Sequence, residues 1–495
     1  MNQAHALQPQ PLRAPAAPPG QRLSALQFAN AYLIELSVLA AMILRFAPEP
    51  YNILPYLILA AVAFTGRTGT IFALAGVWFV SSVNPGLADV APLGSGTRYI
   101  VIAAALLAAL LRASSHRIGD NVSAATVTTA AVAGAIIIHS GVFSFYPSVS
   151  VFKAALWGMV SLTIVSTIRG MTDEDVAKLH RFLLLFFAII IITSLAMMPL
   201  AEARLKNKVG LQGLLNHPQM FGVLCALAGA YFFGTAISSP KPSWLALGMV
   251  VLSLQGVIES AARTGGFALI LACAALVGLA LARSPSFFRR TLPGLFSGRF
   301  AVLTAAAVAA AVINSAAVER VTEQFVRKNS RAEQATTAYD VSRGFIIREM
   351  SDNIQRYPAQ GIGLGIQSAT HLINVEIDKT TGLPLSAPVE KGVMWVAIFE
   401  ELGLLLGLSV FGWILWGTAR AINAGAAAGA GSIAYFFTNF AEATFFSPGA
   451  IGMLGLIIFY LGLARGSREI EPPVSLPAQG PAGGPLASGP APAAW

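Results

Sequence analysis

The chain has 495 residues, of which 55% are hydrophobic and 11% are charged, and its mean hydropathy is +0.68. Soluble domains carry about 25% charged residues, so this composition excludes an ordinary soluble domain and predicts an all-α polytopic membrane protein. The formal net charge of +9 is small for the length, and no dense basic stripe is present, so we expect no nucleic-acid binding. Cys225 and Cys273 lie in apolar segments, where we expect packing rather than a disulfide or a metal site.

The two ends of the chain differ from everything between them. Residues 1–24 are rich in Pro, Ala and Gln and lack the apolar core of a signal peptide, and residues 466–495 are rich in Pro, Gly and Ala. Both compositions predict disordered tails, which we place in the cytoplasm.

Apolar segments fill most of the chain between the tails. A helix needs about 20 residues to cross a bilayer, and some segments are shorter, so we predict about 12–14 transmembrane helices. The first eleven lie within 25–316 and the last three within 392–465, on either side of a loop domain at 317–391. The segments are 26–46, 50–65, 69–84, 97–112, 124–143, 149–168, 180–200, 217–237, 243–260, 264–282, 299–317, 392–418, 425–446 and 449–464.

Basic residues in alternate connections predict the orientation. Cytoplasmic loops of membrane proteins carry an excess of Lys and Arg, and a cytoplasmic N-terminus puts most of these side chains inside. The C-terminus is then also cytoplasmic. The residues in question are Arg67, Arg112, Arg117, Arg169, Lys178, Arg181, Lys241, Arg283, Arg289, Arg290, Arg299, Arg420, Arg465 and Arg468.

Three regions on the predicted outer side break this rule: a basic cluster at 204–208, Arg263, and the loop at 317–391. Long loops cross the membrane largely regardless of charge, which accounts for the third. That argument does not cover Arg263. An ionisable residue at the membrane is by default a functional candidate.

The outer loop is not a simple anion funnel, since residues 318–357 hold seven basic and six acidic side chains. Within it, residues 342–357 predict an amphipathic helix, because Ile346, Met350 and Ile354 repeat every four residues on one face. Pro358 ends this helix.

Asp340 or Ser342 is expected to cap the start of the loop helix, which presents Arg343. An alternative is a plain packing helix, whose arginines at 343 and 348 are solvated or paired with Asp340 and Asp352.

Five short motifs lie in order around the loop. The motifs are Asn216-His217-Pro218-Gln219 within 208–222, Glu259-Ser260-Ala-Ala-Arg263-Thr-Gly265, Ser342-Arg343-Gly344 with the Gly-rich run to Gly365, Glu400-Glu401-Leu402-Gly403, and Asn439-Phe-Ala-Glu442 to Gly449. In this order they resemble the O-antigen ligase and polysaccharide polymerase superfamily of bacterial inner-membrane proteins, over roughly residues 200–465.

The resemblance implies glycosyl transfer at the periplasmic face, from a glycan carried on undecaprenyl diphosphate to a hydroxyl of an acceptor sugar. Polymerases join repeat units, whereas ligases move the chain onto lipid A core. It implies no cofactor or metal, and it names the lipid-linked glycan and the bilayer as partners, with a flippase and a chain-length regulator as further candidates.

The expected chemistry calls for fixed cations, because a diphosphate leaving group gains negative charge in the transition state. Arg263 and Arg343 match positions where the family keeps arginines, and the planar guanidinium binds two phosphate oxygens at once. Other basic residues are candidates for substrate binding. For Arg204, Lys206 and Lys208, the alternative is that they anchor the protein to lipid headgroups. The further candidates are Arg204, Lys208, Arg348 and Lys391.

The expected catalytic base is missing from its usual place. Ligases carry a His-Asn pair eleven residues before the glycine of the Glu-x-Gly motif, and here that position holds Gly392-Val393. Glu390 beside Lys391 is the substitute we expect, since a carboxylate can accept a proton. Histidines at 217 and 371 are the other candidates, with an ordinary interfacial role as the alternative for each.

This difference favours a polymerase for a surface or exopolysaccharide over a ligase. A secondary transporter or flippase is the alternative from another class, but no internal repeat is evident. The glycines at 361, 363 and 365 predict a turn rather than a nucleotide site, with a close backbone approach as the other possibility.

Overall fold

The computed structural model describes residues 32–83, 86, 96–114, 123–204, 210–313, 315, 319, 343–370, 375, 377, 384, 391–449 and 451–466. The predicted tails therefore lie almost entirely outside the described residues. Within the described part the fold is helical without any strand, and two isolated bridges join Val83 to Leu215 and Ile377 to Pro384. The predicted all-α class is confirmed.

Each predicted apolar segment coincides with a helix. Two further helices, α12 and α16, lie outside those segments. The helices are α2 (Leu33–Leu44), α3 (Leu54–Phe64), α4 (Arg67–Ser82), α5 (Thr97–Ser114), α6 (Ala124–Phe143), α7 (Pro147–Arg169), α8 (Asp173–Ala196), α9 (Pro218–Ile237), α10 (Trp244–Glu259), α11 (Arg263–Arg283), α12 (Pro285–Thr291), α13 (Gly298–Ile313), α16 (Phe345–Arg356), α17 (Met394–Ala421), α18 (Ala426–Thr438) and α19 (Gly452–Gly466).

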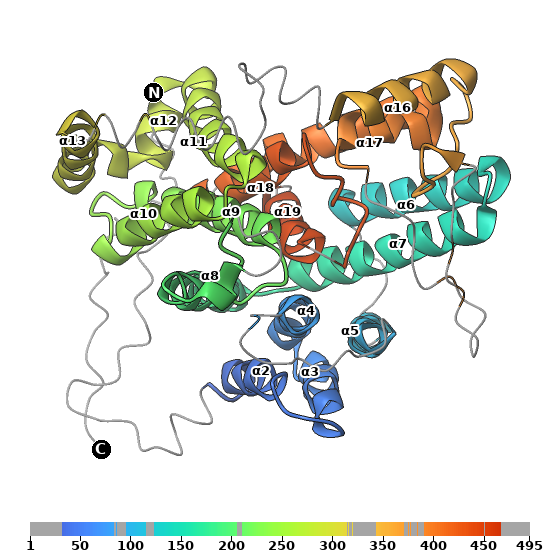
Figure 1. Ribbon diagram of the computed structural model, residues 1–495, viewed down its shortest axis with the longest axis horizontal. Helices are drawn as coiled ribbons and strands as arrows, with labels where there is room; N and C mark the ends of the chain where they lie inside the picture. The colour runs from blue at the N-terminus through green and yellow to red at the C-terminus, as the bar shows by residue number, and fades with distance from the viewer. Residues whose placement is uncertain are drawn as a thin grey trace, which may run out of the picture.

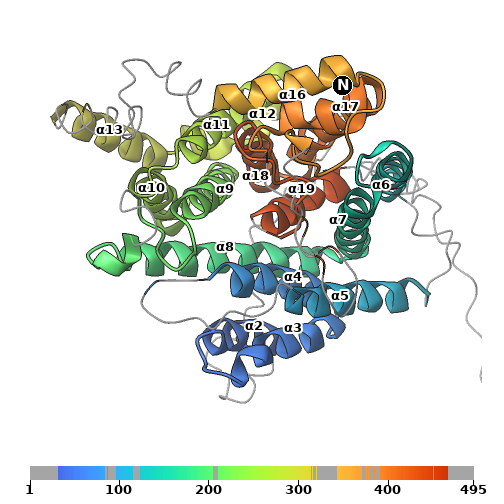
Figure 2. The ribbon, with the colours of Figure 1, turned by 45° about the vertical axis from the view of Figure 1, so that its right-hand side comes forward.

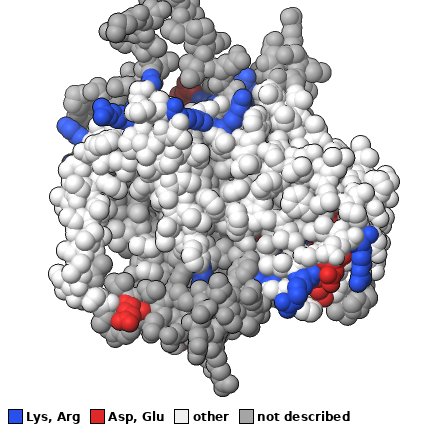
Figure 3. All heavy atoms as spheres, turned by 90° about the horizontal axis from the view of Figure 1, so that it is seen from above, with Lys and Arg blue, Asp and Glu red and all other residues white. Residues whose placement is uncertain are grey.

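Six of these helices are long and apolar enough to cross a membrane, namely α6, α7, α8, α9, α11 and α17. Shorter apolar helices accompany them, including α2, α10, α13 and α19. Large apolar side chains also cover the outside, with Leu405 81% and Leu245 72% exposed, as expected where lipid replaces water. Figure 3 shows a face on which charged side chains gather at two opposite edges, with a broad uncharged band between them. These features show that the chain is a helical membrane protein.

Two helix boundaries differ from the prediction for local reasons. Helix α8 begins at Asp173 rather than near residue 180, because Thr172 and Asp175 form a capping box there. Helix α18 ends at Thr438 instead of continuing to residue 446. Asn439 ends it, since its Oδ1 accepts hydrogen bonds from the backbone amides of Thr444 and Phe445 and so folds the chain into a turn.

The helices are arranged around a central group. Figure 1 shows α18 and α19 at the centre, with α9, α10 and α11 on one side, α6 and α7 on the other, and α17 at the upper right beside α16. Figure 2 shows α8 lying between the layer of α2 to α5 and the rest of the bundle. This arrangement agrees with the contacts of α8 with α4, α9 and α10.

Close contacts at glycines show how α9, α11 and α18 lie relative to one another. A Cβ on Gly265 would lie 2.6 Å from the carbonyl oxygen of Gly222, so α11 and α9 begin side by side. Gly234, near the end of α9, packs instead against the backbone of Ala426 at the start of α18. Helix α18 is thus antiparallel to α9 and ends where α9 and α11 begin. We call this end of the bundle the site end.

The opposite end holds arginines that tie helices together. Arg112 donates to Thr70 at the start of α4, at 2.5 Å. Arg465 pairs with Asp173 and donates to the Met171 carbonyl. Arg283 donates to Asn423, just beyond α17. These are among the basic residues that the sequence places together on one side of the membrane.

Candidate functional site

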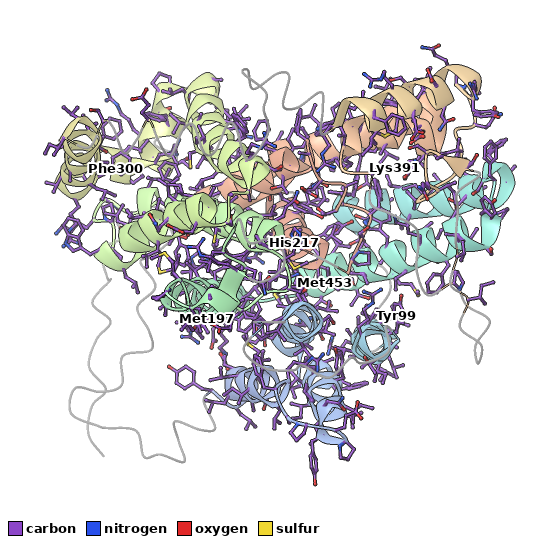
Figure 4. The ribbon with its side chains drawn as sticks, viewed as in Figure 1. Tyr99, Met197, His217, Phe300, Lys391 and Met453 are labelled. Carbon is purple, nitrogen blue, oxygen red and sulfur yellow. The ribbon has the colours of Figure 1, made fainter. Side chains whose placement is uncertain are left out.

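The first motif is held against the starts and ends of neighbouring helices. The amide of Asn216 donates to the carbonyl of Ser82 at 2.9 Å, and the amide of Leu211 donates to the carbonyl of Glu259 at 2.9 Å. His217 then caps α9, because its Nδ1 accepts from the amide of Gln219 at 3.1 Å. The exposed His217 is therefore fixed at the site end (Figure 4).

The second motif places Arg263 at the first turn of α11. Ala261 has a positive φ of 52° and ends α10, and the Oγ of Ser260 accepts from the amide of Ala262 at 3.3 Å. Gly222 of α9 packs against Ser260 and Ala262. Arg263 is half-buried, and it begins its helix beside the first turns of α9, at the same end of the bundle as His217.

The loop helix α16 lies on α17. Met350 is fully buried against Val393 and Ala397, with Ile346 packed on the same cluster, which confirms the predicted apolar face. The helix begins at Phe345, with Gly344 at its N-cap. Asp340 and Ser342, the two residues expected to cap it, lie outside the described residues. It ends at Arg356, as predicted from the proline at 358.

Three of the motifs meet at a chain of polar contacts. Nη2 of Arg343 donates to the carbonyl oxygen of Ala441 at 3.0 Å and lies 3.7 Å from Oε1 of Glu442. The side-chain amide of Gln219 donates to that same carboxylate oxygen. Glu442 thus joins Arg343, from the loop, to Gln219, from the start of α9. Its side chain is 15% exposed, so the contact is largely shielded from solvent.

Gly392, which stands at the position where the family resemblance predicts a histidine, packs against Arg343. Gly392 has φ +69°, and a Cβ built on it would collide with the guanidinium of Arg343. Any larger residue there would displace the arginine. A side chain at residue 392 and the Arg343 guanidinium would therefore occupy the same space.

A break in α17 brings the fourth motif and the Gly-rich run together. Gly403 has φ 70° and ψ 171°, which interrupts the helix. The exposed backbone is bonded by the run after α16: the amides of Ile362 and Gly363 donate to the carbonyls of Glu400 and Glu401 at 2.9 and 3.0 Å. A broken helix inside a membrane protein needs such partners, since no water supplies them.

The three glycines of that run show why both a turn and a close approach are needed. Gly361, Gly363 and Gly365 all have positive φ, so the predicted turn is present. A Cβ on Gly361 would also lie 2.6 Å from the carbonyl oxygen of Glu401. The run therefore presses directly on α17.

Lys391 and two glutamates form a buried ionic network beside this break. Lys391 pairs with Glu400 and lies 3.4 Å from Glu401, and its side chain is 5% exposed. Glu400 is fully buried, and it also accepts from Nδ2 of Asn353 at 2.7 Å and from Oγ of Ser368 at 3.2 Å. Figure 4 labels Lys391 just before α17.

The other predicted substrate ligands lie apart from these contacts or outside the described residues. Arg204 forms a 2.9 Å ion pair with Glu259, which fixes the turn after α8 to the end of α10. Arg348 is exposed, because it lies about 200° around α16 from the buried Met350. The predicted base Glu390 lies outside the described residues, as do Lys206, Lys208 and His371.

Several polar residues of the site received no role from the sequence. Glu442, Gln219 and Glu401 were seen only as letters within motifs, and Lys153 and Asn353 were not singled out at all. A glutamate within an otherwise apolar stretch is the one signal that pointed to Glu442 and to the 400–401 pair, because an ionisable residue in a membrane segment is costly.

No known family model matches the chain, and a search of curated proteins finds no relative.

Proposed function

We propose that this chain is a polymerase of undecaprenyl-diphosphate-linked oligosaccharide repeat units for a surface or exopolysaccharide. The observation that carries the proposal is the contact of Gln219, Arg343 and Glu442, which come from three motifs far apart in the sequence. These are motifs that the resemblance links to glycosyl transfer. Their convergence at one end of the bundle gives them a common site.

The proposed reaction needs cations at the leaving group. The acceptor hydroxyl oxygen forms a bond to the anomeric carbon, the bond from that carbon to the diphosphate oxygen breaks, and the lipid diphosphate leaves with the electron pair. Arg343 and Arg263 bind this diphosphate and stabilise its growing charge. Glu442 orients Arg343, since it lies 3.7 Å from Nη2.

The site end is the periplasmic end in this proposal, and about 12–14 helices cross the inner membrane with both termini in the cytoplasm. The arginines at the opposite end, Arg112, Arg283 and Arg465, support that orientation, because basic residues favour the cytoplasmic side.

Gly392 favours the polymerase over the ligase, because the resemblance implies a histidine at that position in ligases. A side chain there would also require the Arg343 guanidinium to shift from its present place. The ligase is kept as an outcome of the genetic test below.

The decisive experiment is reconstitution of the purified protein in lipid vesicles with lipid-linked oligosaccharide extracted from a deletion strain. A polymerase gives products of rising length without any other protein. Transport of the lipid-linked oligosaccharide with no lengthening would contradict the proposal. In the deletion strain, single repeat units on the carrier indicate the polymerase, whereas long unattached chains indicate the ligase.

A matched pair of arginine variants tests the site. Arg343→Ala is expected to lower the rate of elongation at least about 100-fold, the usual effect of losing one group that stabilises the transition-state charge. Arg356→Ala, at the other end of α16, is the control, since Arg356 is exposed. Its elongation rate should lie within about threefold of the parent rate. Equal losses of rate in both variants would mean that Arg343 is not part of the site.

A further inference from the structure

A small pocket lies between α7, the start of α17 and the turn after α18. Its volume is about 20 Å³, which is room for about one water molecule or hydroxyl group. Three of its lining residues are charged and five are apolar. The lining residues are Lys153, Lys391, Glu401, Met394, Ala397, Ile398, Ala443 and Phe446.

The two neighbouring glutamates of α17 differ in what they face. Glu400 has no exposed surface, and its carboxylate is bonded by Asn353, Ser368 and Lys391. Glu401 lines the pocket, its side chain is 10% exposed, and Lys391 lies 3.4 Å away. Glu400 is therefore fully engaged in the fold, whereas Glu401 faces a space that a small polar group can enter.

The backbone around Glu401 is held rigidly. Its carbonyl accepts from the amide of Gly363 at 3.0 Å, and the break at Gly403 follows two residues later. On the other side, Leu404 donates its amide to the carbonyl of Pro358 at 2.7 Å. These bonds fix the backbone from which the Glu401 side chain projects, and Lys391 lies 3.4 Å from its carboxylate.

The pocket adjoins the Arg343 contacts through two short stretches of chain. Lys391 in the pocket precedes Gly392, which packs on the Arg343 guanidinium. Ala443 in the pocket follows Glu442, which lies 3.7 Å from Nη2 of Arg343. A group in the pocket is thus next to the place where the diphosphate is proposed to bind.

We propose that this pocket receives the attacking hydroxyl of the acceptor sugar and that Glu401 is the catalytic base. The inference rests on the proposed function above. As the hydroxyl oxygen bonds to the anomeric carbon, its proton passes to the Glu401 carboxylate, and the diphosphate leaves with the electron pair of the broken bond. The protonated Glu401 then loses the proton to solvent at the site end.

The other lining residues limit what can enter. Phe446 and Met394 give the pocket an apolar boundary, and its volume admits the attacking hydroxyl group while the sugar ring stays outside. Lys391 pairs with both glutamates, and Lys153 adds a second cation to the lining of the pocket. The alternative role of Glu401 is purely to neutralise Lys391.

The test compares turnover with donor binding in the reconstituted protein. Glu401→Gln is expected to lower the elongation rate about 100-fold or more, the usual share of general base catalysis. Undecaprenyl diphosphate should still stabilise the variant, measured as a shift in Tm. The apparent Kd obtained from this shift should lie within about threefold of the Kd of the parent protein. An elongation rate of Glu401→Gln within threefold of the parent rate overturns the inference. It is also overturned if the affinity for undecaprenyl diphosphate falls by the same factor as the elongation rate.

A second variant covers the case in which Glu401→Gln does not fold. Glu401→Asp keeps a negative charge beside Lys391, so the network with Glu400 keeps its charges, but the carboxylate is drawn back by one methylene group. It should fold, bind undecaprenyl diphosphate and elongate at least about tenfold more slowly than the parent, because the base is misplaced by about 1 Å. A folded Glu401→Asp variant that elongates at the parental rate overturns the inference.

The failure of this inference is separable from failure of the proposed function. If the parent protein gives no product of rising length, the proposed function fails, and the base assignment fails with it. If the parent elongates, Arg343→Ala does not, and Glu401→Gln elongates normally, only the base assignment is wrong.

Discussion

Nη2 of Arg343 lies 3.7 Å from Oε1 of Glu442, although one residue precedes α16 and the other follows α18. Both side chains are largely buried, with exposed fractions of 23% and 15%. The same carboxylate oxygen accepts from the side-chain amide of Gln219. This one carboxylate therefore holds a loop arginine against two membrane helices.

We expect Glu442→Gln to leave the protein folded and to lower elongation about tenfold, because a charge-assisted bond that orients Arg343 becomes a weaker neutral one. The measurement is a double-mutant cycle with Arg343→Ala in reconstituted vesicles. Residues that act as a unit give non-additive losses, so the double variant should be no slower than Arg343→Ala alone. Fully additive losses would mean that Glu442 acts independently of Arg343.

Gly392→Ala is expected to abolish elongation. The added Cβ would collide with the Arg343 guanidinium, and the left-handed φ of +69° costs an alanine about 1–2 kcal/mol. Gly412→Ala is the matched control within α17, because nothing lies within 4 Å of a Cβ there. Elongation rates and Tm of both variants check this, and a fully active Gly392→Ala would contradict the described position of Arg343.

Gly403→Ala should destabilise the protein by about 1–3 kcal/mol, because φ 70° with ψ 171° is a conformation that essentially only glycine adopts. The Cβ would also collide with the carbonyl oxygen of Ala359. A lowered Tm in detergent is the readout, with Gly278→Ala on α11 as the control, since a Cβ at Gly278 meets nothing within 4 Å. If both variants melt together with the parent, α17 is not broken at Gly403.

Removing one partner of the Lys391–Glu400 pair should cost about 3–5 kcal/mol, because the remaining charge is left buried without its partner. We expect Lys391→Met and Glu400→Gln each to lower Tm strongly. The double variant should be considerably less destabilised than the sum of the two, since both substituted side chains are neutral and neither leaves the other as an unpaired buried charge. Additive losses of Tm would show that the two residues do not interact in the folded protein.

The positions of the helices were predictable from the sequence, because an apolar segment in a membrane must form a helix to satisfy its backbone hydrogen bonds. Backbone groups in lipid must bond within the segment, so α6, α7 and α11 lie where the apolar runs predicted them. The boundaries that failed, at α8 and α18, depend on side-chain bonds of Thr172 and Asn439, which hydropathy does not register.

The candidate site was only partly predictable. The sequence itself determined the helical class, the membrane character, and an amphipathic helix with Met350 on its buried face, because these follow from local periodicity. Only the tertiary structure decided that Arg343 meets Glu442, that it fills the space beside Gly392, and that Glu401 rather than Glu400 faces a pocket. Such contacts join segments far apart in the chain, and their geometry depends on how whole helices pack rather than on the residues next to them.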